Sequence, residues 1–314
     1  MVLVMLEILL GTGASPRMGV VVPSGVVPRP RAYHRTLSLA GELYISGGWS
    51  GTEQLDEILK YDPATGVCTA LRQNSGYGRH SHNVMANAAG TAIYQLYGAG
   101  GTLRNTYDKL TRPGSNFTTN SLSASGRAQR QEASSGFIGG YGYLFGGWDL
   151  NNNMLNETLR WTPETTTMAL MNPANPPVAR RGATYEVMNE QLYVLGGATD
   201  SDASNRLKDF WCYNPAANTW TRLADFPETI RHSTMCAVNG KLYVHGGVGD
   251  SADAGAKMRV YNPATDTWSV LDIGKTTAYA GMAGSAVGDS IYYFGGVDTK
   301  DVISNRLFRF TPPA

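Results

Sequence analysis

The sequence predicts an all-β fold assembled from six copies of one unit of about 50 residues. Its 314 residues include 37 glycines, 17 tyrosines and 6 tryptophans, which favours many short strands joined by tight turns. A Tyr-x-x-Gly-Gly pattern also recurs along the chain. The tyrosines that begin it lie 49 or 50 residues apart, at Tyr44, Tyr94, Tyr143, Tyr193, Tyr243 and Tyr292. A fixed period of this length indicates a repeat architecture.

Each unit contains four short stretches with the composition of β-strands. In the fifth unit they are rich in β-branched and aromatic residues, and they cover residues 233–238, 242–245, 258–261 and 268–271. Asn239-Gly240 predicts a tight hairpin turn between the first two stretches. The Gly-Gly pair at the end of the second stretch allows positive φ angles and a close approach of neighbouring sheets.

Prolines repeat in step with the tyrosines. Each proline follows the third predicted strand of its unit, and the six are Pro63, Pro113, Pro163, Pro215, Pro263 and Pro312. In five of the six units an aromatic residue stands two positions before the proline. This combination resembles the kelch repeat over residues 18–314, although Tyr97 replaces the first glycine in the second copy. The resemblance implies a six-bladed kelch β-propeller. Its blades would lie at about 31–73, 79–120, 130–171, 180–223, 231–271 and 279–314.

The sixth copy has no fourth strand of its own, because only two residues follow Pro312. Trp220 and Trp268 each precede the start of the next unit by 11 residues, and Val20 lies 11 residues before Arg31. We therefore expect an N-terminal strand at about residues 19–23 to complete the last blade. Without it the sheet would keep an open edge.

Residues 1–17 fall outside the predicted propeller, and nine of the first ten are apolar. Exposed apolar segments favour association. We expect this segment to dock to a protein partner in a larger assembly through Val2, Leu3, Val4, Leu6, Ile8, Leu9 and Leu10. Alternatively it folds back on its own propeller or lies on a membrane surface, although the first ten residues lack basic side chains. Glu7 interrupts an apolar run too short to span a bilayer, and the run lacks the leading Lys or Arg of a signal peptide.

Charge and cysteine content exclude several classes of function. With 26 Lys+Arg against 25 Asp+Glu, the chain has no excess of basic residues for binding nucleic acid. Cys68, Cys212 and Cys236 are too widely spaced for a metal site or a disulfide framework. The sequence also lacks a nucleophile elbow, a phosphate-binding loop and a metalloprotease helix. We expect no cofactor and no enzymatic activity.

Arginines recur just before the first predicted strand of several units. Arg31, Arg130 and Arg180 stand 13 residues before their tyrosines and Arg231 stands 12 before, while Arg79-His80 approximates the position in the second unit. Guanidinium groups gathered around one channel could bind carboxylates or acidic sugars. Alternatively each arginine pairs with a neighbouring loop and holds the blades together.

Histidines and tryptophans supply the remaining candidate binding residues. His80 and His82 alternate on one face of a strand, a spacing compatible with metal binding, and His34 and His232 begin strands in two other blades. Because no further ligand is evident, we expect no metal. Trp49 and Trp148 each follow a Gly-Gly pair. Either tryptophan could stack on a sugar or a protein partner, or pack against the next blade.

These observations favour a non-enzymatic interaction or structural subunit, anchored in a larger assembly by its N-terminal segment. By analogy, a bacteriophage virion protein of the tail or baseplate would suit this design, and a virion or cytoplasmic location follows from the missing signal peptide. The alternatives are a carbohydrate-active kelch enzyme, such as a sialic-acid mutarotase, and a propeller that binds a glycan at its loop face without turnover.

Overall fold

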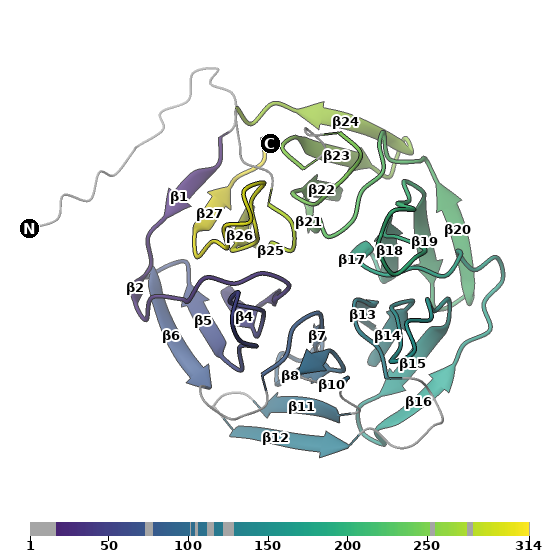
Figure 1. The fold of residues 1–314 in the computed structure, drawn as a ribbon, viewed down its shortest axis with the longest axis horizontal. Helices are drawn as coiled ribbons and strands as arrows, with labels where there is room; N and C mark the ends of the chain where they lie inside the picture. Colours follow the sequence, from purple (N-terminus) through teal and green to yellow (C-terminus); the bar gives the residue numbers. More distant parts are fainter. Residues whose placement is uncertain are drawn as a thin grey trace, which may run out of the picture.

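The propeller is described by a computed structural model for residues 17–72, 78–100, 102–103, 106–111, 116–121, 129–251, 255–274 and 279–313. Every regular element in these residues is a β-strand. Figure 1 shows six sheets arranged around a central axis, with the chain running from each sheet to its neighbour. The predicted six-bladed β-propeller is confirmed.

Each blade contains four antiparallel strands, which follow one another from the central channel to the outer rim of the propeller. The innermost strands are β3 (Arg35–Leu39), β7 (Asn83–Ala86), β13 (Ser134–Ile138), β17 (Thr184–Met188), β21 (Thr234–Val238) and β25 (Ala283–Val287). The second strands are β4 (Glu42–Ser46), β8 (Ala92–Leu96), β14 (Tyr141–Phe145), β18 (Gln191–Leu195), β22 (Lys241–His245) and β26 (Ser290–Phe294).

The third strands are β5 (Ile58–Asp62), β11 (Thr106–Thr111), β15 (Thr158–Thr162), β19 (Phe210–Asn214), β23 (Met258–Asn262) and β27 (Leu307–Phe310). The outer strands of the first five blades are β6 (Val67–Arg72), β12 (Asn116–Ser121), β16 (Thr167–Leu170), β20 (Thr219–Leu223) and β24 (Thr267–Leu271). A small hairpin of β9 (Ala99–Gly100) and β10 (Thr102–Leu103) lies between the second and third strands of the second blade.

The N-terminal strand β1 (Gly19–Val21) completes the sixth blade. It pairs antiparallel with β27, with Val20 opposite Phe308, so the expected closure is confirmed. The sequence did not predict the next step. The following strand β2 (Ser24–Gly25) pairs in parallel with β6 and adds a fifth strand to the first blade. One short segment thus joins the last blade to the first (Figure 1).

The Gly-Gly pairs connect neighbouring blades. The second residue of each pair donates a backbone hydrogen bond of 2.8–3.2 Å to a carbonyl in the next blade, and Gly98 does the same in the degenerate copy. At Gly47, φ is +59°, and an added Cβ would collide with the carbonyl oxygen of Arg79 and lie 2.9 Å from the His82 ring, both in the next blade. A side chain would therefore separate the two segments.

Aromatic side chains fill the space between blades. Trp161 is 0% exposed and lies edge-on to Tyr94 of the preceding blade, with ring centroids 4.9 Å apart. Trp220 is 1% exposed and packs at a tilt against Phe145 of its preceding blade, with ring centroids 4.7 Å apart. The repeated aromatic positions therefore bury apolar area between successive sheets, which stabilises the ring.

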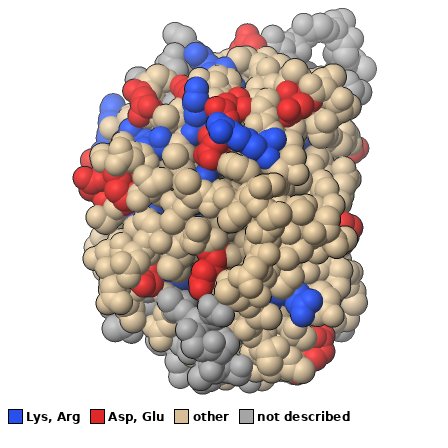
Figure 2. Space-filling model, turned by 90° about the vertical axis from the view of Figure 1, so that its right-hand side faces the viewer, with Lys and Arg blue, Asp and Glu red and all other residues tan. Residues whose placement is uncertain are grey.

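Two further expectations concern the surface and the N-terminus. Figure 2 shows charges of both signs interspersed on one side of the molecule, in keeping with the near-zero net charge. Residues 1–16, which contain the expected docking residues, lie outside the described part of the chain. None of the described segments forms a helix long and apolar enough to cross a membrane.

Candidate functional site at the mouth of the channel

Six residues form a closed collar at one end of the central channel. Each lies two positions before the inner strand of its blade, and the members are Tyr33, Ser81, Glu132, Gly182, His232 and Gly281. The backbone N–H of each donates to the carbonyl oxygen of the preceding member, with N···O distances of 2.8–3.1 Å. The bond from Tyr33 to Gly281 joins the first blade to the sixth, so these bonds form a continuous ring.

The collar holds its residues in a left-handed backbone conformation. All six φ angles lie between +52° and +61°, a region that costs a residue other than glycine about 1 kcal/mol or more. Glycine at two positions makes room for aromatic neighbours. A Cβ on Gly182 would lie 2.5 Å from Nε2 of His232, and one on Gly281 would lie 2.8 Å from the Tyr33 ring. Tyr33 and His232 themselves meet edge to face at 5.2 Å.

Glu132 is the charged centre of the collar. Its carboxylate lies 3.2 Å from Nε2 of His232 and 3.2 Å from Nη1 of Arg181, and its side chain is 11% exposed. Burial alone would raise its pKa, but His232, Arg181 and Arg231 together lower the pKa of Glu132 to about 2. The carboxylate is therefore ionised at neutral pH.

Two tryptophans flank the collar on the loops that follow the second strands. The Trp148 ring lies 4.4 Å from the guanidinium carbon of Arg181, a cation–π contact between the third and fourth blades. Trp49 meets His80 edge to face at 6.3 Å, in the corresponding place between the first and second blades. Both tryptophans therefore pack against a cationic or imidazole side chain of the next blade.

The repeated arginines lie in the protein interior. Arg31, Arg79, Arg130 and Arg180 are at most 1% exposed. Each donates to a carboxylate at or just before the third strand of its own blade, and the partners are Glu57, Asp108, Glu157 and Asp209. Each also donates to a backbone carbonyl at the end of the second strand. These contacts favour the structural alternative for the arginines.

Arg231 does not belong to this interior set. Ile230, which is 0% exposed, occupies the position equivalent to Arg180, because the spacing to the next tyrosine is one residue shorter for Arg231. Arg231 instead lies at the mouth beside the collar, where its Nη1 donates to Nδ1 of His232 at 3.0 Å. It forms no ion pair within the described residues, and its Nε has no hydrogen-bond partner there.

The four candidate histidines separate into two pairs. His34 and His82 are 0% exposed, and burial lowers the pKa of each well below 6.5, so both are neutral interior groups. His80 and His232 lie at the mouth, where His232 bonds to Glu132 and His80 to the Ser81 hydroxyl. In the described part of the chain, no three His, Cys, Asp or Glu side chains gather as a metal site would require.

Glu132, Arg181 and Tyr33 are mouth residues that sequence reasoning missed. They come from three blades and lie 49, 99 and 148 residues apart, so no local motif joins them. The available signal is positional. Aligning the units on their tyrosines places Tyr33 and Glu132 two residues after the repeated arginine and Arg181 one residue after it.

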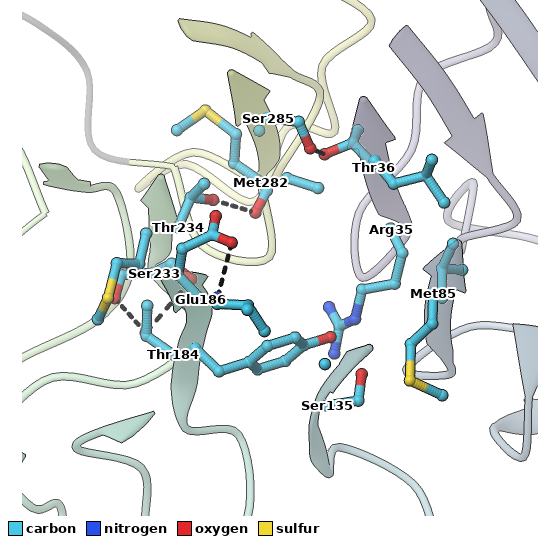
Figure 3. Close-up of a pocket in the computed structure, with 18 of the residues that line it drawn as sticks. Arg35, Thr36, Met85, Ser135, Thr184, Glu186, Ser233, Thr234, Met282 and Ser285 are labelled. Carbon is cyan, nitrogen blue, oxygen red and sulfur yellow. Dashed lines mark hydrogen bonds between the residues drawn. The ribbon is translucent and has the colours of Figure 1, made fainter. Parts of the chain in front are cut away.

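The channel contains a cavity of about 500 Å³, lined by the collar residues at its mouth and by all six inner strands. Figure 3 shows Arg35, Thr36 and Met85 on one side of it, opposite Thr184 and Glu186. Burial raises the pKa of Glu186 to about 7, although hydrogen bonds from the N–H groups of Val187 and Ala237 lower it in part. Within the described residues, no cation pairs with this carboxyl.

Comparison with known proteins identifies the same repeat. Residues 132–313, more than half of the chain, match the KLHDC2/KLHL20/DRC7 Kelch-repeats domain, and residues 30–74 match the Kelch motif. The chain is 32% identical over 137 residues to an F-box/kelch-repeat protein of Arabidopsis thaliana. That alignment covers 43% of this chain and 36% of the relative.

Two further relatives have different names. Kelch-like protein 35 of Mus musculus is 30% identical over 110 residues, which cover 35% of this chain and 18% of the relative. N-acetylneuraminate epimerase of Haemophilus influenzae is 34% identical over 140 residues, covering 42% of this chain and 35% of the relative. The chain thus matches about a third or less of the length of these relatives. This chain belongs to the kelch-repeat family.

Proposed function

We propose that the protein is a non-catalytic kelch interaction subunit that recognises an acidic group at the channel mouth. The observation that carries this proposal is Arg231, a half-buried guanidinium at the mouth with no carboxylate partner in the described residues. A carboxylate could accept a bidentate pair of hydrogen bonds from such a group. Trp148 and His80 border the same face and supply flat surfaces for contact.

The F-box/kelch-repeat and kelch-like relatives support a binding role. The Glu132 carboxylate supports it as well. A pKa of about 2 makes this group a weak proton acceptor at neutral pH, so it serves better to position Arg181 and His232 than to abstract a proton. The acidic partner would be either a protein carboxylate or an acidic sugar.

Assembly into a larger particle is the second part of the proposal. Residues 1–17 would anchor the propeller to a protein partner, and a bacteriophage tail or baseplate is the setting we propose, in a virion or the cytoplasm. Size-exclusion chromatography of the full chain and of a variant lacking residues 1–16 tests the anchor. A full chain that self-associates or captures a partner, with a monomeric truncated variant, would agree with it. Two identical monomeric profiles would contradict it.

One observation favours a second candidate, a sugar-converting enzyme related to the epimerase. Glu132 and His232 lie 3.2 Å apart beside Arg231, and the relative is named N-acetylneuraminate epimerase. Anomerisation of an acidic sugar needs an acid and a base near the bound ring. Exchange spectroscopy of N-acetylneuraminate by NMR distinguishes the two. Exchange between anomers accelerated by the protein, and lost in Glu132→Gln, would favour the enzyme over the binding subunit.

Calorimetric titration tests recognition of an acidic group directly. The probes are N-acetylneuraminate and a short peptide that ends in Asp or Glu. Arg231→Ser should weaken binding of whichever probe binds by at least about tenfold, as expected for loss of a charge-assisted hydrogen bond. Arg259→Ser is a matched control because Arg259 pairs with Glu228 away from the collar. No binding of either probe, or equal binding by both variants, would contradict the proposal.

A further inference from the structure

Arg35 occupies a position where four of the other blades carry a short polar side chain and the sixth carries Ala283. In four blades the side chain of the first residue of the inner strand donates to a backbone carbonyl of the next blade. Asn83 donates to Ala133, Thr184 to Ser233 and Thr234 to Met282, at 2.7–3.3 Å. Nε of Arg35 does the same toward His82, at 2.9 Å. A threonine could also donate this hydrogen bond, so most of the Arg35 guanidinium is not required for the contact between blades.

The remainder of the guanidinium extends into the channel. Its carbon lies 5.7 Å from the centroid of the Tyr185 ring, which belongs to the fourth blade. The first and fourth blades stand on opposite sides of the ring (Figure 1), so this contact crosses the channel. Nη1 reaches the carbonyl of His34 at 3.3 Å, whereas Nη2 has no hydrogen-bond partner in the described residues. No carboxylate there neutralises Arg35.

Two hydroxyl groups lie at the same level of the channel. Ser135 and Tyr185 each hold the second position of their inner strands, β13 and β17, and both line the cavity. Ser135 is 3% exposed, and its buried hydroxyl has no hydrogen-bond partner among the residues that the structure describes. The Tyr185 hydroxyl also forms no hydrogen bond to a described residue. Figure 3 shows Arg35 extending toward the side of the cavity where Ser135 lies.

We propose that the channel interior is a second binding site, which holds a small molecule through its carboxylate or phosphate group. Arg35, Ser135 and Tyr185 would donate hydrogen bonds to the anionic oxygens, which satisfies the buried Ser135 hydroxyl. The cavity of about 500 Å³ is in the range of small-ligand sites and is larger than one phosphate ion. Leu37, Met85 and Phe137 line it and would contact the body of the ligand.

Thermal unfolding of the full chain with added anions tests this site. The probes are inorganic phosphate, acetate and benzoate, which differ in charge and in the size of the attached group. At least one should raise Tm in a saturable manner, because a ligand that binds only the folded state stabilises it. Arg35→Thr copies the residue of the fourth and fifth blades and retains the bond to the His82 carbonyl. It should weaken the binding of that probe by at least about tenfold.

Arg231→Thr is the matched control, since it removes a guanidinium from the mouth and leaves the channel interior intact. A saturable Tm shift that is retained in this variant and lost in Arg35→Thr supports the channel site. Ser135→Ala and Tyr185→Phe, which leave the charge in place, should each weaken binding by a smaller factor. Failure of all three probes to shift Tm would overturn the proposal. So would a shift that persists in Arg35→Thr or disappears equally in both arginine variants.

Discussion

Glu132 and Glu186 line the same channel, yet the protein shifts their pKa values in opposite directions. Glu132 lies in the collar, where His232, Arg181 and Arg231 lower its pKa to about 2 against the effect of burial. Glu186 lies deeper, where burial raises its pKa to about 7 and only backbone N–H groups bond to it. The difference shows that three cationic or imidazole side chains surround Glu132 at the mouth, whereas Glu186 is desolvated with no such side chain beside it in the described residues.

The two regions also differ in backbone strain. The collar holds four non-glycine residues at positive φ, whereas the inner strands just beyond it are ordinary extended backbone. Strained residues persist where the surrounding structure fixes them, and such residues concentrate at functional sites. The closed ring of six hydrogen bonds provides that fixation at the mouth.

Opening the ring of blades should have the largest effect, because the mouth and the interior of the channel both depend on the closed ring. Deletion of residues 1–23 removes β1 and leaves β27 with an open edge. We expect loss of the cooperative unfolding transition, measured by calorimetry or circular dichroism. Deletion of residues 1–16 keeps β1 and is the matched control. A cooperative transition at the same temperature in both variants would contradict the closure.

Removing the charge of Glu132 should destabilise the protein. Its pKa falls from 4.5 to about 2 on folding, which corresponds to about 3 kcal/mol of stability at neutral pH. This contribution is present above pH 4.5 and is lost as the pH falls toward 2. Glu132→Gln should therefore lower the free energy of unfolding by about 3 kcal/mol at pH 7, measured by urea denaturation. The difference from the wild type should shrink below pH 4.

Removing the charge of Glu186 should have the opposite sign. Its pKa rises from 4.5 to about 7 on folding, so the folded state binds more protons and becomes less stable as the pH rises through this interval. Glu186→Gln should match the wild type near pH 4 and exceed its free energy of unfolding by up to about 3 kcal/mol at pH 8. A variant that is destabilised equally at both pH values would refute this assignment.

Replacing glycine by alanine should destabilise the protein more in the collar than in a hairpin turn outside it. Gly281 in the collar and Gly240 in a hairpin turn both have positive φ, but only at Gly281 would a Cβ meet another side chain, the Tyr33 ring. We expect Gly240→Ala to cost about 1 kcal/mol from backbone strain and Gly281→Ala about 2 kcal/mol or more. Equal losses in chemical denaturation would indicate that the Tyr33 ring moves aside at no cost.

The fold could be predicted well from the sequence, because the repeat consists of residues that fix the backbone conformation of every blade. The tyrosine period, the glycine pairs and the spacing around Val20 each reflect a local requirement that every blade shares. In the other described blades, the parallel pairing of β2 with β6 recurs only as a single bridge between Ala174 and Thr219 of the fourth blade, so the repeat pattern did not predict it.

The mouth was harder to predict because its contacts are made between blades. Glu132 and His232 lie 100 residues apart, and the collar that joins them is a backbone feature that tolerates Tyr, Ser, Glu, His or Gly. The sequence pattern groups Arg231 with the interior arginines because its spacing to the next tyrosine differs from theirs by only one residue. That one-residue difference places Arg231 at the mouth instead of in the interior. Glu186 gave no signal, since its environment depends on strands from two blades.

The contrast between the two carboxyl groups can be measured directly by NMR titration of the full chain with ¹³C-labelled glutamate side chains, assigned with Glu132→Gln and Glu186→Gln. The account predicts that the Glu186 carboxyl titrates near pH 7, while the Glu132 carboxyl stays ionised down to the lowest pH at which the protein remains folded. Two carboxyl groups that titrate together near pH 4.5 would contradict it.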